Sequence, residues 1–454
     1  MTTTTAQPVI QNRDDLIKAL DEAAELEQGL MCQYLYAAFT MKKAGEPDSP
    51  YGPALSPAQY EITRRWQATI LKVARQEMEH LALVNNLRLG IGAPPYFWRP
   101  NFPVKYEYDP FTLPFMLERF DFASIERFIV FEQPDEYSPD DCGPDPKIIA
   151  LHSAPRYNGL LASGGVAIRP ASYPRIDSIQ VLYDAIQDAV NNVHGIPELE
   201  NLFVFQDQSE SREHEPYDNF VFSQEANVFV FPVYDRRTAN AAIDEILKEG
   251  EGVSSQPSYA SHYCSFSWIH DGMKAAGFDA AWNVITNPSA ENVTDPVALS
   301  AMGLFDDAYT TMLYMLTSFY AYYVPENDQS QPGPGPNGKI SAALQDCAFA
   351  PMMTMILRPL AEIITRLPAG DGAHTAGPAW AIPDDDRPLT PSSDPAFFLD
   401  RLTRIVDKLG ALGPEAPAEI RPRLEYIRQS AWRMQANFAR TATGSASNET
   451  EAPA

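Results

Sequence analysis

Two long stretches near the start of the chain repeat apolar residues with the period of an α-helix. The first spans residues 13–43, where Asn12 or Asp14 can cap its start, and its apolar face carries Leu16, Leu20, Ala23, Leu26, Leu30 and Tyr34. The second spans residues 57–89, and its apolar face carries Ile62, Trp66, Ile70, Val73, Val84 and Leu87. We therefore predict two long amphipathic helices whose apolar faces point inward.

The pattern is weaker in the middle of the chain and again helical towards its end. Helical spacing predicts elements at 124–132, 176–193, 238–252, from 261, from 299, at 340–367, 395–412 and 422–440. Residues 135–172 read as irregular, and apolar alternation at 201–205 and 227–231 predicts a small hairpin. Composition further divides the chain into a flexible N-terminus (1–11), a first helical domain (12–290), a C-terminal helical domain (299–440) and a disordered tail (441–454).

One pair of chemically active residues lies on the inward face of the second long helix. Glu77 and His80 are three residues apart, so a helix places them on the same face, where a carboxylate and an imidazole can hold one metal ion. Glu27 lies among apolar neighbours on the preceding helix. Buried ionisable groups need a partner or a metal, although His80 as a core histidine and Glu27 as a solvated acid are simpler alternatives.

Composition narrows the classes of partner. The net charge is −26, which argues against nucleic acid and against an anionic membrane surface. We expect that no run is long and apolar enough to span a bilayer. The four cysteines lack paired spacing, so we expect neither a disulfide framework nor a zinc site, with Cys32 as a buried apolar residue and the cytoplasm as the location.

Several motifs together resemble a known family. They are Glu27-Gln28-Gly29-Leu30-Met31-Cys32-Gln33-Tyr34, the Glu77/His80 pair, Ile179-Gln180-Val181-Leu182-Tyr183, Lys248-Glu249-Gly250-Glu251-Gly252, Ser261-His262 and Arg358-Pro359-Leu360. The series is similar to the ferritin-like family named after the iminophenyl-pyruvate dimer synthases, enzymes that couple two amino-acid-derived imines in bisindole and indolocarbazole biosynthesis. The resemblance covers most of residues 12–385.

The resemblance implies a mainly α fold: a ferritin-like helical bundle with irregular and small β insertions, plus a C-terminal helical unit. It also implies a metal site in the bundle, with Glu27, Glu77 and His80 as ligands. Because a second Glu-x-x-His pair is missing, Glu251 and His262 are the residues expected to complete the site. Glu132, at the end of a short helix, is interpreted as structural. Iron, as one or two ions, suits such ligands, and manganese is compatible with them.

Three functions are compatible with these features. The first is a metal-dependent oxidoreductase or coupling enzyme that acts, with dioxygen, on a small aromatic substrate derived from an amino acid. The second is a metal-binding protein without catalysis, and the third is a metal-free scaffold for a partner protein. A homo-oligomer is compatible with all three, and no residue identifies a dedicated general base.

Overall fold

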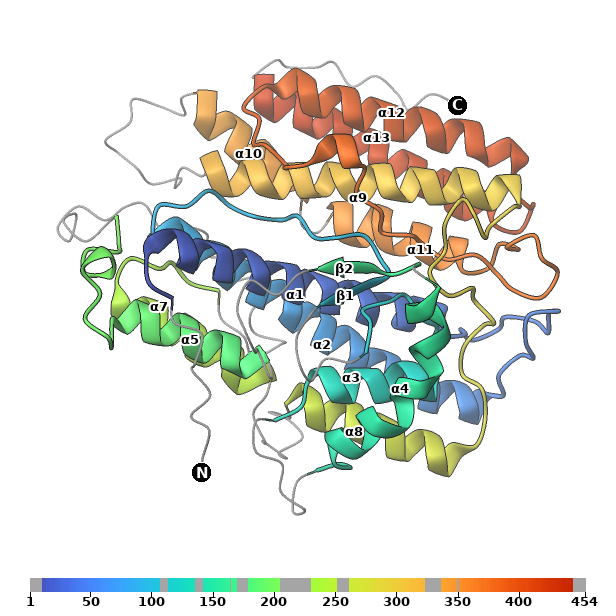
Figure 1. Cartoon of the computed structure of the whole chain (residues 1–454). Helices are drawn as coiled ribbons and strands as arrows, with labels where there is room; N and C mark the ends of the chain where they lie inside the picture. Colours follow the sequence, from blue (N-terminus) through green and yellow to red (C-terminus); the bar gives the residue numbers. More distant parts are fainter. Residues whose placement is uncertain are drawn as a thin grey trace.

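The computed structural model describes residues 10–106, 113–134, 142–163, 165–169, 179–204, 230–250, 261–322, 336–348 and 351–443. Helices dominate these residues (Figure 1), in agreement with the predicted mainly α fold. The helices are α1 (Arg13–Thr40), α2 (Pro57–Gly90), α3 (Phe122–Phe131), α4 (Pro146–Ala162), α5 (Ile179–Asn191), α7 (Arg236–Gly250), α8 (His262–Ala276), α9 (Pro296–Tyr322), α10 (Pro336–Ala348), α11 (Arg358–Ile364), α12 (Pro395–Glu415) and α13 (Arg421–Thr443).

The two long N-terminal helices α1 and α2 form the centre of the molecule. The side chain of Asn12 accepts the backbone N–H of Asp15 and so caps α1, while Ser56 and Gln59 form a reciprocal capping box at the start of α2. Every residue of α1 from Glu22 to Thr40 is buried. A helix that is buried on all sides must be surrounded by other elements, and α1 is therefore the core of the fold.

Four further helices surround this central pair. Helices α3 and α8 pack against each other, and α8 also packs on α2. Helices α5 and α7 pack together, with α5 on α1 and α7 on α2 (Figure 1). Gly29 of α1 allows one close approach, because a Cβ there would lie 2.9 Å from Cδ2 of Phe115. The middle of α1 is thus enclosed by short helices on either side.

The C-terminal helices form a layer of their own over α1. Figure 1 shows α12 running beside α9 and α13, with α10 towards one end of α9 and α11 between α9 and α1. A π-helical stretch, Pro351–Leu357, leads into α11, and short 3₁₀ turns occupy Pro197–Leu199 and Asp384–Asp386. Buried contacts join this layer to the rest, for example the hydrogen bond from Gln28 Nε2 to Tyr309 Oη at 2.7 Å. The boundary between two domains stays a prediction.

The structure corrects several predicted elements. Residues 135–172 were expected to be irregular, yet they contain α4 and the strand β2 (Ala167–Arg169), which pairs in parallel with β1 (Val104–Tyr106). The sequence did not indicate α4, because Pro155 lies inside the helix and the apolar residues are not confined to one face. The predicted hairpin is wrong where it can be followed, because residues 201–204 and 230–231 are not strands. Its other residues, 205 and 227–229, lie outside the described part.

A disulfide joins two segments that are distant in sequence. Cys142, between α3 and α4, pairs with Cys264 in the first turn of α8, with their Cα atoms 5.3 Å apart. The sequence predicted no disulfide, and for this pair the prediction was wrong. Their separation of 122 residues leaves no local signature, so only the tertiary fold reveals the pairing. Cys32 and Cys347 are free and buried, as expected for Cys32.

One helical stretch meets the length and hydropathy of a membrane span. Among the described residues, Lys339–Ile364 is long and apolar enough to cross a bilayer, so the expectation that no run reaches this limit was wrong. Of its most apolar 18-residue window, 60% is buried inside the protein. Core helices pass the same test, and the burial of this stretch matches that explanation.

A buried carboxylate ties the C-terminal layer to the end of α1. Glu362 of α11 is nearly buried and contacts the ammonium group of Lys43, the guanidinium of Arg423 at 2.6 Å and that of Arg358 at 3.2 Å. Burial alone would raise the pKa of Glu362, but these three cations outweigh it and lower the pKa to about 2. Burial lowers the pKa of Lys43, so the cost of burying this ammonium group offsets part of the stabilisation that the ion pair with Glu362 provides.

We expect Glu362→Gln to destabilise the protein at pH 7 by roughly 2 kcal/mol. This loss is smaller than the lowered pKa of Glu362 alone implies, because burying Lys43 costs free energy. A carboxyl group whose pKa is lowered on folding stabilises the protein above its ordinary pKa of 4.5. The difference between variant and wild type should therefore shrink as the pH falls from 4.5 towards 2. Denaturant unfolding at several pH values measures it.

The matched control is Glu425→Gln, because Glu425 is an exposed partner of Arg428 on α13. Exposed pairs contribute little, so this variant should unfold like the wild type. A loss of stability in Glu362→Gln that does not change between pH 7 and pH 3 would contradict the electrostatic explanation.

Candidate metal centre

Helices α1 and α2 place three predicted ligands together. Glu27 lies midway along α1, and Glu77 and His80 lie one turn apart on the facing side of α2. The Nδ1 atom of His80 is 3.4 Å from Oε2 of Glu77 and 3.5 Å from Oε2 of Glu27. All three side chains are at most 2% exposed. The interaction predicted from the spacing of Glu77 and His80 is therefore present in the fold.

Helices α3 and α8 bring two further residues to the same place. Glu132 is the residue that ends α3, and His262 is the first residue of α8, which Ser261 caps. The Nδ1 atom of His262 lies 2.9 Å from Oε1 of Glu77 and 3.3 Å from Oε2 of Glu132. Both side chains are buried.

The five side chains form two groups that share Glu77. One group is Glu27, Glu77 and His80, and the other is Glu77, Glu132 and His262. Within each group the candidate ligand atoms lie within 4.8 Å of one another. Glu77 faces His80 with Oε2 and His262 with Oε1, and the two imidazole rings lie with their centroids 5.5 Å apart. This is the arrangement of a carboxylate placed between two cation positions.

Several polar atoms of this cluster lack hydrogen-bond partners, and a bound metal would satisfy them. Nε2 of His80 and Nε2 of His262 are buried and have no hydrogen-bond partner among the described residues, and Nδ1 of His262 lies 2.9 Å from Oε1 of Glu77 without the alignment of a hydrogen bond. Buried polar groups without partners are costly and uncommon. Three carboxylates and two imidazoles are also a donor set that suits iron or manganese. The residues present therefore fit a metal site.

In the metal-free cluster, bringing these ionisable groups together in a buried site shifts their pKa values. Burial and the adjacent carboxylate of Glu77 raise the pKa of Glu27 to about 7. Burial would lower the pKa of His262, but Glu77 and Glu132 outweigh it and raise the pKa to about 9. Burial would raise the pKa of Glu77, but His262 beside it lowers it. Without a metal, protons on the imidazoles and on one carboxyl group balance the charge.

The five clustered side chains line a small cavity whose wall also includes residues of α5 and α7. Its volume is 10 Å³, which suits an ion or a water molecule and not an aromatic ring. The apolar part of its wall comes from Leu30, Ile179, Ile246 and Leu247, and Tyr183 also lines it. Beside it, Gln76 donates a hydrogen bond to the buried carboxylate of Glu249 and links α2 to the end of α7.

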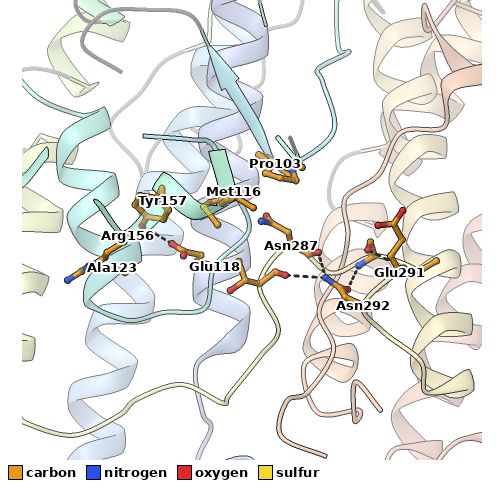
Figure 2. Close-up of a pocket in the computed structure, with 15 residues that line it drawn as sticks. Pro103, Met116, Glu118, Ala123, Arg156, Tyr157, Asn287, Glu291 and Asn292 are labelled. Atoms are coloured by element: carbon orange, nitrogen blue, oxygen red, sulfur yellow. Dashed lines mark hydrogen bonds between the residues drawn. The ribbon is translucent and has the colours of Figure 1, made fainter. Parts of the chain in front are cut away.

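A much larger pocket lies elsewhere on the protein. Its volume is 810 Å³, and Figure 2 shows Glu118, Arg156 and Tyr157 on one side of it and Asn287 and Asn292 on the other. None of the five clustered residues lines it. Its polar groups pair with protein neighbours: Tyr157 donates to Glu118 at 3.2 Å, and Arg156 donates to Glu126 at 2.8 Å. We therefore place the candidate chemistry at the small cavity.

The structure brings together four of the five residues predicted from the sequence: Glu27, Glu77, His80 and His262. Glu251 lies outside the described residues. Glu132, which the sequence interpretation took as structural, also lies in the cluster. The available signal was its position directly after the apolar run 128–131, whose residues are all buried, where an acid needs a partner.

In the presence of a chelator, we expect the free energy of unfolding to fall by roughly 3 kcal/mol between pH 6.5 and 9 because of His262. A histidine whose pKa rises on folding stabilises the protein fully below 6.5, and this contribution is lost as the pH rises through 9. The His262→Gln variant should lack this loss. Denaturant titrations of the metal-free protein measure it.

His152→Gln is the control, because His152 is exposed on α4. Excess metal should reverse the pH dependence of the wild type, since deprotonated ligands bind metal more tightly. Equal pH dependence in wild type and His262→Gln would contradict the assigned environment.

Comparisons with known proteins agree with the helical fold of this chain. A family model described as Ferritin-like matches residues 20–271, which is more than half of the chain and includes all five clustered residues. Dichlorochromopyrrolate synthase from Lentzea aerocolonigenes is 28% identical over 85% of this chain and 38% of its own length. The 2-imino-3-(indol-3-yl)propanoate dimerase from Chromobacterium violaceum is 25% identical over 83% of this chain and 35% of its own length.

The chain thus spans little more than a third of the length of these two curated relatives. The crystal structure of a ferritin like protein from Caulobacter vibrioides matches 69% of this chain and 88% of that one, with 17% identity and a TM-score of 0.41. The resemblance predicted from the sequence is confirmed by the family model and by both relatives. On the strength of the family model, the chain belongs to the ferritin-like family.

Proposed function

We propose that this protein is a metal-dependent enzyme whose centre holds two cations on either side of Glu77. The observation that carries the proposal is the pair of groups that share this one carboxylate, each with a further glutamate and a histidine of its own. In this assignment Glu27 and His80 bind one ion, and Glu132 and His262 bind the other. Two divalent cations would more than balance the charge of the three carboxylates, and the histidines would then bind as neutral ligands.

Iron is the ion that we assign, and manganese is the alternative with the same ligand preferences. When bound here, iron supplies a reversible change of oxidation state to the reaction. The protein holds it with side chains from four helices and keeps bulk water away with the apolar wall of α5 and α7. Because the cavity has the size of ions and water, we assign to it the metal and small molecules such as water or dioxygen, and not the aromatic substrate.

The proposed reaction is the oxidative coupling of two small aromatic molecules derived from an amino acid. Both curated relatives are named as enzymes, and the name of one describes the dimerisation of an indole-bearing imino acid. Joining two such molecules by one carbon–carbon bond removes one hydrogen from each, or two electrons and two protons. Dioxygen can accept both, which gives hydrogen peroxide.

Metal analysis of single variants tests the shared ligand. We expect about two ions per chain in the wild type, about one in Glu27→Ala or Glu132→Ala, and almost none in Glu77→Ala. The measurement is anaerobic loading with Fe²⁺ or Mn²⁺, followed by equilibrium dialysis and elemental analysis.

Glu79→Ala is the matched control, since Glu79 is a nearly buried acid on the same helix that pairs with Arg75 instead. It should keep the metal content of the wild type. Equal metal content in Glu77→Ala and the wild type would contradict the assigned centre.

Oxygen uptake tests the reaction. We expect the iron-loaded wild type to consume dioxygen when the imine formed from indole-3-pyruvate and ammonium is added, and to form a product of twice the substrate mass less two hydrogens. The Glu77→Ala variant should behave like buffer that contains free iron. An oxygen electrode and mass spectrometry measure both quantities. Tight metal binding without substrate-dependent uptake would favour a metal-binding protein without catalysis.

A further inference from the structure

Two buried tyrosines hold the outer oxygens of the two unshared glutamates. The hydroxyl of Tyr183 on α5 donates a hydrogen bond to Oε1 of Glu27, and the hydroxyl of Tyr34 on α1 donates one to Oε1 of Glu132. Both tyrosines are fully buried. In each pair the hydroxyl is the donor, because an ionised carboxylate can only accept a hydrogen bond.

The opposite oxygen of each glutamate faces the imidazole of the same group. Oε2 of Glu27 lies 3.5 Å from His80, and Oε2 of Glu132 lies 3.3 Å from His262. Glu77 differs, because its two oxygens each face one imidazole. The two kinds of glutamate therefore differ. Each unshared glutamate accepts a hydrogen bond from a tyrosine hydroxyl on one oxygen, whereas the shared glutamate accepts none from a tyrosine of the described residues.

We propose that Tyr183 and Tyr34 are positioning residues, one for each metal position, that make Glu27 and Glu132 bind through a single oxygen. This inference rests on the proposed metal centre. A glutamate whose outer oxygen accepts a strong hydrogen bond turns its other oxygen to the metal, and a coordination position that a two-oxygen ligand would fill stays open. Such open positions are what a reacting molecule needs in order to reach the metal.

The two tyrosines come from different parts of the fold, so their effects can be separated. Tyr183 belongs to the α5–α7 pair and lines the cavity. Tyr34 lies on α1, packed edge-on against Phe128 at a centroid distance of 4.6 Å and near Phe266 at 4.9 Å. A phenylalanine keeps these ring contacts at either position and removes only the hydroxyl. Tyr→Phe variants therefore test the hydrogen bond with little change in packing.

The experiment measures Mn²⁺ and Co²⁺ binding to the full chain under anaerobic conditions for wild type, Tyr183→Phe and Tyr34→Phe. We expect each variant to weaken the binding of one ion by about 10- to 100-fold and to leave the other unchanged. The visible absorption of bound Co²⁺ should also change at one position, because a glutamate free to use both oxygens alters its coordination number. A purely structural role of the hydroxyl would not change this spectrum.

Combined variants assign each tyrosine to its position. Adding Tyr183→Phe to Glu27→Gln should have no further effect on metal affinity, whereas adding Tyr34→Phe should weaken the remaining ion. Tyr157→Phe is the matched control, because Tyr157 is a buried tyrosine that donates to Glu118, outside the centre. It should bind both ions like the wild type.

The outcomes separate this inference from the proposal on which it rests. Wild-type protein that binds no metal contradicts the metal centre and this inference with it. Wild-type protein that binds two ions, with the same affinities and Co²⁺ spectra in both tyrosine variants, contradicts the inference alone. Equal weakening of both ions by each variant also contradicts it, because each tyrosine is then not tied to one position.

Discussion

Two buried carboxylates that each lie within a few ångströms of a shared third are the constraint on which the rest of this structure depends. Glu27 approaches Glu77 from α1 and Glu132 approaches it from the end of α3, and a low-dielectric interior makes the repulsion costly. Only protons, imidazolium groups or a bound cation can offset it. The other features of the site surround these acids. Two histidines face them, tyrosine hydroxyls donate to the outer oxygens of Glu27 and Glu132, and residues of α5 and α7 line the cavity beside them.

The part of the centre that could be predicted without the family resemblance is the part encoded by helical periodicity. Glu77 and His80 are neighbours on one helix, so their spacing alone places them on one face, and the apolar stripe around them shows that the face is buried. Glu27 follows from the same argument on α1. The cap of α1 was predicted as Asn12 or Asp14, and it is Asn12. A cap can be predicted because it is a local interaction between residues three apart.

The rest of the centre depends on contacts that no local pattern records. Glu132 and His262 are 130 residues apart in number, and each lies at a helix end, where an acid or a first-turn histidine has ordinary structural explanations. Their meeting depends on how α3 packs on α8. The same holds for the disulfide between Cys142 and Cys264, while α4 was missed because its apolar positions are not confined to one face.

The sharing of Glu77 has a thermodynamic consequence for how the centre fills. In the proposed two-ion centre, whatever fixes this side chain for one cation would also fix it for the other, so the two occupancies would be linked and each binding event would change the affinity of the other by the same factor. The first ion would meet an acidic cluster partly neutralised by protons, whereas the second would meet a carboxylate already deprotonated and oriented. The orientation of Glu77 by the first ion favours binding of the second, and repulsion between the two cations opposes it. The balance of these two terms decides whether half-filled molecules accumulate when metal is scarce.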